Sequence, residues 1–201
     1  MEKYLIIIAG PPATGKSYLI NKLVTKLERS VVLAPDEFKI DMAESVGFNN
    51  LEEKEALEVK VWQLYYEAME LYMRVGKRYI LTEYPFSYKQ KRQLEELSNR
   101  YGYNPITIRL VADFDVLWER RRVRDREHSR HLSLIMNHYH YGDKLENRNE
   151  ANCLITEENF KKIIDDRGYN TFQLGELFEY DVTDFSNVNY IPLFEYLKQL
   201  K

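Results

Sequence analysis

The feature that most constrains the fold of this chain is an eight-residue loop near its amino end. Residues 10–17 read Gly-Pro-Pro-Ala-Thr-Gly-Lys-Ser and match the pattern G-x-x-x-x-G-K-S/T without a mismatch. The loop follows a short apolar run, Tyr4–Ala9, and precedes a segment in which apolar residues recur at helical spacing as far as Leu27. A strand, this loop and a helix in that order are the context in which the motif binds phosphate. The sequence therefore predicts a nucleotide site here.

Each part of this loop suits the phosphates of a nucleotide. Its glycines let the backbone curve around phosphate oxygens, so that successive N–H groups and the dipole of the following helix point at the anion. Lys16 is expected to reach the β- and γ-phosphates, and the hydroxyl of Ser17 is expected to bind Mg²⁺. The residues predicted to bind the nucleotide are Gly10, Pro11, Pro12, Ala13, Thr14, Gly15, Lys16, Ser17 and Tyr18.

The composition favours a single domain over residues 1–201. Of the 201 residues, 44% are hydrophobic and 30% charged, which is enough apolar material for a sizeable core. The longest apolar run, residues 5–9, is far shorter than the ~20 residues that cross a bilayer, and the amino end does not read as an export signal. The lone Cys153 excludes a disulfide framework, so we expect a cytoplasmic protein. A net charge of −3 gives no general attraction for nucleic acid or a membrane. The oligomeric state is left open, with a homodimer among the alternatives.

Strands and helices alternate along the rest of the chain. Further strands are predicted at residues 31–34, 78–82, 105–111 and 178–182. Capping residues predict helices that begin after Asn50, Ser87 and Thr156, and further helices are expected from Phe114 and Asn189. This order predicts an α/β protein with a doubly wound parallel sheet of five strands, whose ligands bind outside the carboxyl ends of the strands.

The helix after Asn50 carries two apolar stripes. The first is predicted to face the core and consists of Leu57, Val61, Leu64, Ala68, Leu71 and Val75. The second lies on another face and consists of Trp62, Tyr65, Tyr66, Met69, Tyr72 and Met73. We therefore expect this helix to be covered from two sides, with core packing as the main role of the second stripe and a substrate wall or subunit contact as the alternatives.

Two carboxylates lie at the ends of the second and third predicted strands. Asp36 comes just after the second strand, where it can orient an alcohol and accept its proton; the alternative is that it caps the next helix. Glu83 ends the third strand, where an acidic group can hold Mg²⁺ or contact the phosphoryl acceptor; the alternative is an ordinary surface carboxylate. We predict Asp36 as the base and Glu83, with Ser17, as a metal ligand.

A cluster of arginines begins the segment 120–150, which we call the lid segment. Six arginines, Arg120, Arg121, Arg122, Arg124, Arg126 and Arg130, occupy eleven residues. A guanidinium that closes over a transferred phosphoryl group stabilises its developing charge, whereas a solvated helix face is the alternative for some of these side chains. We predict Arg124 first, then Arg120, then Arg130 as the arginine that acts on the phosphates.

All four histidines, His128, His131, His138 and His140, lie within the lid segment. Their spacing fits no common zinc frame, and only one thiol is present in the chain. Polar contacts to the acceptor or to ATP are the preferred interpretation.

The other motifs narrow the class of nucleotide-binding protein. A guanine-specific N-K-x-D is absent from the sequence, and the one D-x-x-G, residues 165–168, ends a late predicted helix, which argues against a small GTPase. An AAA+ motor needs a longer chain and a paired acidic end to its third strand, where Glu83 stands alone. The compact kinases remain.

Three stretches taken together resemble one group of kinases. The chain resembles the P-loop kinases of the polynucleotide kinase, zeta toxin and chloramphenicol phosphotransferase group. The similar stretches are Gly-Pro-Pro-Ala-Thr-Gly-Lys-Ser at 10–17, Asp-Glu-Phe at 36–38 and the arginine-rich stretch through 124–126 and 130–131. The resemblance implies a three-layer P-loop NTPase fold with strand order 2-3-1-4-5, Asp36 in the position of the base, and lid arginines, Arg130 included, on the phosphates. It also implies that the turn at 181–184, with Asp184, borders the adenine. Glu83 replaces the Asp or Asn of several relatives, and His-Leu-Ser at 131–133 replaces a His-Pro-Gly, so the resemblance does not identify the acceptor.

We therefore expect a kinase that uses ATP and Mg²⁺ and phosphorylates a hydroxyl of a small molecule. The first alternative is a kinase for nucleotides or for nucleic-acid 5′-hydroxyl ends, which the lack of a basic patch outside the lid segment disfavours. The second is an ATP-binding module without catalysis, which docks a partner through the aromatic helix.

Overall fold

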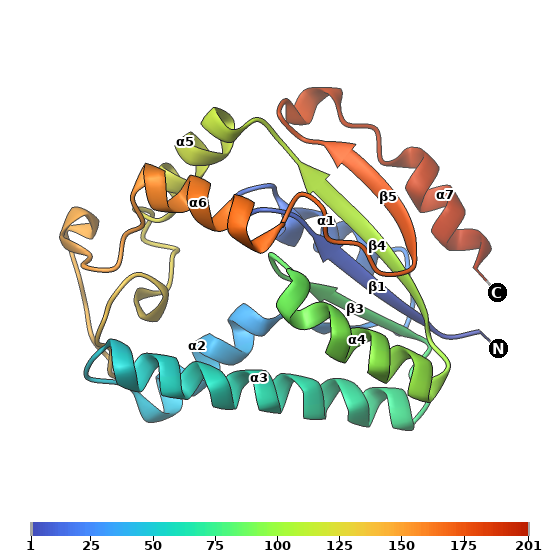
Figure 1. The fold of residues 1–201 in the computed structure, drawn as a ribbon, viewed down its shortest axis with the longest axis horizontal. Helices are drawn as coiled ribbons and strands as arrows, with labels where there is room; N and C mark the ends of the chain where they lie inside the picture. Colours follow the sequence, from blue (N-terminus) through green and yellow to red (C-terminus); the bar gives the residue numbers. More distant parts are fainter. Residues whose placement is uncertain (1, 201) are drawn as a thin grey trace.

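The fold is built on one parallel sheet, as the sequence predicts. The computed structural model describes residues 2–200. Five strands, β1 (Tyr4–Ala9), β2 (Val31–Leu33), β3 (Tyr79–Glu83), β4 (Asn104–Val111) and β5 (Glu176–Asp181), pair in the order β2-β3-β1-β4-β5, and every pairing is parallel (Figure 1). This order confirms the P-loop NTPase topology that the resemblance implies.

Helices cover both faces of the sheet. They are α1 (Lys16–Val24), α2 (Pro35–Val46), α3 (Leu51–Arg74), α4 (Tyr88–Tyr101), α5 (Phe114–Arg124), α6 (Glu157–Arg167) and α7 (Ile191–Gln199). Short 3₁₀ turns η1 (Leu132–Leu134), η2 (Arg148–Glu150) and η3 (Phe185–Asn187) complete the described chain. Asn50, Ser87 and Thr156 each accept a backbone hydrogen bond at the start of their helices, which confirms the three predicted caps.

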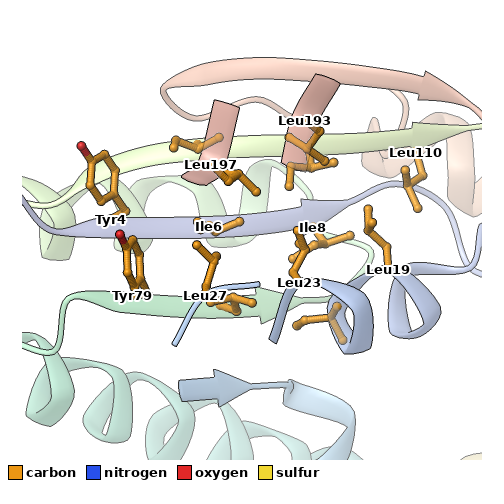
Figure 2. Packing of buried hydrophobic residues seen from close by; sticks show 14 of the residues in the cluster. Tyr4, Ile6, Ile8, Leu19, Leu23, Leu27, Tyr79, Leu110, Leu193 and Leu197 are labelled. Carbon is orange, nitrogen blue, oxygen red and sulfur yellow. The ribbon is translucent and has the colours of Figure 1, made fainter. Parts of the chain in front are cut away.

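The central strand β1 separates two halves of the core because its successive side chains point to opposite faces. Ile6 and Ile8 lie in one cluster with residues of α1 and α7, and Figure 2 shows Leu193 and Leu197 packed over them. Leu5 and Ile7 lie in the other cluster, with residues of α3 and α4. All six residues of β1 are buried, as expected for a strand covered on both faces.

A third apolar cluster fixes the lid segment to α2 and α3. Its buried members are Ala43, Phe48, Leu57, Leu132, Ile135, Tyr139 and Ala151. Phe48 and Tyr139 also form an isolated antiparallel bridge, with backbone N–H···O distances of 2.8 Å in both directions. Figure 1 shows the yellow-to-orange chain between α5 and α6 reaching the amino end of α3. Much of the lid segment is therefore packed onto the domain.

The predicted core face of α3 was wrong at three of its six members, while Ala68 packs against the core as expected. Leu57 and Val61 are buried as expected, but Leu64, Leu71 and Val75 are 41%, 49% and 69% exposed. The buried face instead continues at a strict spacing of four residues through Tyr65, Met69 and Met73. These larger side chains belong to the predicted second stripe and pack against the sheet, so the helix is covered from one side and not from two. The prediction assigned the aliphatic residues to the core, whereas in the structure the bulkier Tyr65, Met69 and Met73 are buried.

Some element ends also differ from the predictions. The helix after the loop ends at Val24, although Leu27 is still buried, and β2 ends at Leu33 because Pro35 opens α2. Within residues 2–200, helices that are long and apolar enough for a bilayer do not occur.

Candidate functional site

Most of the predicted site residues line one cleft at the carboxyl ends of β1 and β3, whereas Gly10, Pro11, Thr14 and Asp184 are not part of its lining. The cleft has a volume of about 680 Å³ and is lined by the phosphate loop, α2, the end of β3, α5, the lid segment and α6. Figure 1 shows α5 and α6 beside the carboxyl ends of the strands, whereas both chain termini lie at the amino ends. This is the edge where a doubly wound sheet binds its ligands.

The phosphate loop has the backbone that an anion site needs. Gly10, Ala13 and Gly15 have φ values of 124°, 71° and 81°. A Cβ on Gly10 would lie 2.0 Å from the carbonyl oxygen of Leu110, so only glycine fits there. The loop ends at the start of α1, where the described residues place neither a side-chain cap nor an acidic side chain in the first turn. The positive end of the helix is thus open to an anion.

Lys16 lies over the loop, and its side chain is almost completely buried. Its Nζ donates to the carbonyl oxygens of Gly10 at 3.1 Å and Pro11 at 2.8 Å. Burial lowers the pKa of Lys16 to about 8, while the carboxylate of Glu83 acts in the opposite direction. An ammonium held by two carbonyl oxygens in a desolvated site gains more from a phosphate than from either carbonyl.

The two predicted metal ligands are in direct contact. The Ser17 hydroxyl donates to Oε2 of Glu83 at 3.0 Å, which joins the start of α1 to the end of β3. Burial raises the pKa of Glu83, whereas the hydrogen bond from Ser17 and the charge of Lys16 lower it. A carboxylate and a hydroxyl are oxygen donors of the kind that Mg²⁺ prefers, so the pair fits that ion.

Asp36 lies in the first turn of α2, on the opposite side of the cleft from α5. Ala34 occupies the cap position and Pro35 the first helical position, so the alternative in which Asp36 caps the helix is wrong. The Asp36 side chain is 43% exposed, and its Oδ1 lies 3.9 Å from Nζ of Lys39. A carboxylate with open access to the cleft can still accept a proton.

Lys39 is a cleft residue that the sequence analysis missed. Its Nζ lies 3.4 Å from Oε2 of Glu58 and donates to the Tyr84 hydroxyl at 3.2 Å. Burial lowers the pKa of Lys39, but the surrounding Tyr84, Asp36 and Glu58 outweigh this and raise it overall. Its position three residues after Asp36 on a helix was the available signal, since residues so spaced share a face.

The predicted arginines divide into two groups. Arg124 and Arg130 line the cleft together with Arg121, which the ranking left out. Arg120 also lines the cleft, but its guanidinium donates to the carbonyl oxygens of Val182 at 2.8 Å and Thr183 at 2.9 Å. Its guanidinium carbon lies 3.9 Å from the ring centre of Phe185, a second residue that the sequence analysis missed.

Asp184 lies close enough to Arg120 for its charge to act on the guanidinium, and Tyr18 was also predicted to bind the nucleotide. The Asp184 carboxylate accepts hydrogen bonds from the backbone N–H and the hydroxyl of Ser186, at 2.9 and 2.8 Å, and so caps η3. Tyr18 lines the cleft with its side chain largely exposed. The Phe185 ring also approaches the loop, because a Cβ on Gly15 would lie 3.1 Å from it. The turn implied by the resemblance therefore borders the phosphate loop.

His131 and His140 make polar contacts within the lid segment and with the residues beside it. Nε2 of His131 lies 2.7 Å from Oε1 of Glu44, and its Nδ1 lies 2.7 Å from the Ser133 hydroxyl. Nε2 of His140 lies 3.0 Å from Oδ1 of Asn49. Of the two, His131 lines the cleft.

Fold and site together define a P-loop domain of the kinase-like group. The chain belongs to the P-loop family described as AAA domain, AAA_33, whose model matches residues 5–137. This match shows the domain family, whereas our exclusion of an AAA+ motor stays a prediction. No curated protein matches the sequence.

Solved structures similar to this one include one that is described as a kinase. A proposed kinase from Chloroflexus aurantiacus J-10-fl has a TM-score of 0.76 and 25% sequence identity, and the alignment covers 100% of both chains. The tunicamycin resistance protein of Deinococcus radiodurans has a TM-score of 0.55 and 18% identity over 98% of this chain and 94% of that one. A chain of the Pnkp1/Rnl/Hen1 RNA repair complex has a TM-score of 0.58 and 12% identity over 87% and 47%. The last two share the fold alone.

Proposed function

We propose that this protein transfers the γ-phosphoryl group of ATP to a hydroxyl of a small molecule, with Mg²⁺. One observation carries the proposal. A single cleft holds Lys16 and the Ser17–Glu83 pair on one side, the Asp36 carboxylate on another, and the guanidinium groups of the lid segment facing them. Phosphoryl transfer requires mainly this combination of positioning and charge.

The phosphate loop and Lys16 bind the triphosphate in this proposal. The backbone N–H groups of the loop and of the first turn of α1 face the phosphates, and Lys16 moves its hydrogen bonds from two carbonyl oxygens to the anion. The Phe185 ring, held by Arg120, supplies a flat apolar surface for the adenine ring of ATP near the turn that contains Asp184. Arg120 therefore serves the adenine ring and not the transferred phosphoryl group.

Ser17 and Glu83 are the residues that would hold Mg²⁺. The ion, when bound, neutralises charge on the β- and γ-phosphate oxygens. The chain contributes a hydroxyl and a buried carboxylate that already lie 3.0 Å apart, so little rearrangement is needed to bring them to one ion. Without a cation, the burial of Glu83 is costly, as its raised pKa indicates.

Asp36 acts as the base for the acceptor. Its carboxylate accepts the hydroxyl proton as the acceptor oxygen forms a bond to the γ-phosphorus and the bond from that phosphorus to the leaving ADP oxygen breaks. Lys39, whose Nζ lies 3.9 Å from Oδ1, helps to orient the Asp36 carboxylate. Arg124 and Arg130 neutralise the charge that spreads over the transferred group.

Two measurements test this proposal in sequence. Calorimetry with ATP, with and without Mg²⁺, is expected to show binding that the metal strengthens. A screen of small hydroxylated compounds with γ-labelled ATP is then expected to give a labelled product, and Asp36→Asn is expected to lower its formation about 100-fold or more. Asp41→Asn, the same change at an exposed position of α2, is the matched control.

Each outcome separates this proposal from its alternatives. An undiminished product with Asp36→Asn would show that Asp36 is not the base. Label transfer to 5′-hydroxyl ends of nucleic acid, with binding that weakens steeply with salt, would favour the nucleic-acid alternative. Tight ATP binding without transfer to any compound, combined with tolerance of Arg124 and Arg130 substitutions, would favour a binding module.

A further inference from the structure

Asp125 is a buried carboxylate at the end of α5 that none of the roles above uses. Only 3% of the residue is exposed, which is unusual for an aspartate unless it is paired. Its position is set by its own backbone N–H, which donates to the carbonyl oxygen of Arg121 at 3.0 Å at the carboxyl end of the helix. The carboxylate therefore lies behind the arginines that line the cleft.

Three guanidinium groups contact this one carboxylate. Nε of Arg121 donates to Oδ2, which fixes one side of the carboxylate. Nη2 of Arg124 lies 3.2 Å from Oδ1, and Nε of Arg130 lies 3.5 Å from the same oxygen. Arg121 lies one turn before Asp125 on α5, Arg124 directly precedes Asp125 in the chain, and Arg130 lies further along the lid segment. Asp125 is thus the common partner that brings them together.

The cluster carries more positive than negative charge. One carboxylate faces three guanidinium groups, and the Asp36 carboxylate acts on Arg121 and Arg130 from the other side of the cleft. Burial, together with the charge of Arg124, lowers the pKa of Arg130 to about 10. In the described residues, the buried Nε of Arg130 also lacks a hydrogen bond that satisfies it. Such a cluster has the charge and the free donors for one more anion.

We propose that Asp125 is a positioning residue that holds Arg121, Arg124 and Arg130 as one preformed unit for the phosphoryl group in transfer. The inference rests on the proposed kinase activity and adds to it a residue that does not touch the substrate. Arginines fixed in advance do not spend conformational entropy when the transition state forms. Asp125 also limits their mutual repulsion before ATP arrives.

This role predicts an effect on turnover that differs from the effect on ATP binding. In Asp125→Asn the arginines keep their charge but lose their common partner, so ATP is still attracted while the guanidinium groups are misplaced. We expect kcat to fall about 100-fold, in line with the cost of an ångström-scale misplacement. The KM for ATP is expected to stay within about threefold, because binding in the ground state is retained.

The assay measures phosphate transfer to the acceptor found in the screen or, failing one, release of phosphate from ATP to water. Asp115→Asn, an exposed position on the same helix, is the matched control. Asp125→Glu, which keeps the charge, is expected to recover part of kcat. Unchanged kcat in a folded Asp125→Asn protein would overturn the inference. A parallel loss of kcat, ATP affinity and melting temperature would also overturn it, since it would show a purely structural ion cluster.

A second set of variants keeps the inference testable if Asp125→Asn does not fold. Arg124→Gln, Arg130→Gln and the double variant are compared with the unchanged protein. If Asp125 makes the arginines act as a unit, the double variant loses clearly less than the product of the two single losses. Independent, multiplicative losses would contradict the inference. Wild-type protein that binds no ATP would refute the proposed kinase itself, whereas normal wild-type turnover with multiplicative losses would refute only the role of Asp125.

Discussion

The phosphate loop and the lid segment face each other across the cleft but are held in different ways. The loop owes its shape mainly to residues next to one another in sequence, with positive φ at Gly10 and Gly15 and a helix that begins at once, although Gly10 also packs closely on Leu110 of β4. The lid segment depends on partners far away in the chain, such as Phe48 for Tyr139 and Glu44 for His131. A site of this kind combines one locally encoded half with one that only the tertiary fold assembles.

The largest effect is expected from the locally encoded half. Lys16→Met removes the one ammonium that the loop aims at the phosphates, and we expect phosphoryl transfer to fall on the order of 100–1,000-fold. The same change at Lys26, an exposed lysine just beyond α1, serves as the control in the same labelled-ATP assay. Retention of more than a tenth of the activity in Lys16→Met would break the assignment of the loop to the triphosphate.

Backbone shape in the loop is expected to matter for stability as well. Gly10→Ala places a Cβ 2.0 Å from the Leu110 carbonyl oxygen at a φ of 124°, which we expect to cost about 3 kcal/mol of unfolding free energy. Gly76→Ala is the matched control, because Gly76 also has positive φ but open space around it, and about 1 kcal/mol is expected. Urea unfolding of both variants measures the difference. Equal losses of unfolding free energy in the two variants would mean that the close packing of Gly10 on β4 does not hold the loop in place.

The sequence predicts features that depend on neighbouring residues well, and it misses features that depend on distant contacts. The buried run of β1, the loop, and the caps Asn50 and Ser87 are patterns within a few residues, and all lie where they were expected. The buried face of α3 was predicted wrongly because the choice between two apolar stripes depends on what the sheet presents to the helix. Secondary structure was thus readable from local pattern, whereas the facing of a helix was not.

The candidate site divides likewise. The contact between Ser17 and Glu83 could be expected, since the loop before Ser17 follows β1 and Glu83 ends β3, its neighbour in the predicted sheet order. Lys39 and Asp125 were missed, and Arg121 was left out of the ranked arginines, because a charged residue on a helix is normally solvated. Only the tertiary fold shows that these residues are buried or paired. The different place of Arg120 has the same cause, because its partners lie 62 and 63 residues later in the chain.

A pH titration sharpens the comparison, since the two halves hold their positive charge differently. Because the pKa of Lys16 is lowered to about 8, its ammonium is lost as the pH rises through that value. We expect affinity for ATP to be steady below about pH 7.5 and to weaken above it by up to about tenfold per pH unit. Calorimetry between pH 7 and 9 checks this. In Lys16→Met the decline should disappear; if it persists, another group is responsible.

The smallest effect is expected from a single contact of the lid segment. Tyr139→Phe keeps the ring against Phe48 but removes the hydroxyl that donates to Glu44, a residue that also holds His131. We expect a loss of about 1 kcal/mol in unfolding free energy, the usual worth of one hydrogen bond. Tyr141→Phe, at a residue that is 80% exposed, is the control and should change little. Hydrogen exchange would then show faster opening of amides in η1 than in β1, because the contact links the lid segment to α2 and not to the sheet. Equal acceleration in both places would mean that the lid segment and the sheet unfold as one unit, and that the distant contacts of this half are as firmly fixed as the local geometry of the loop.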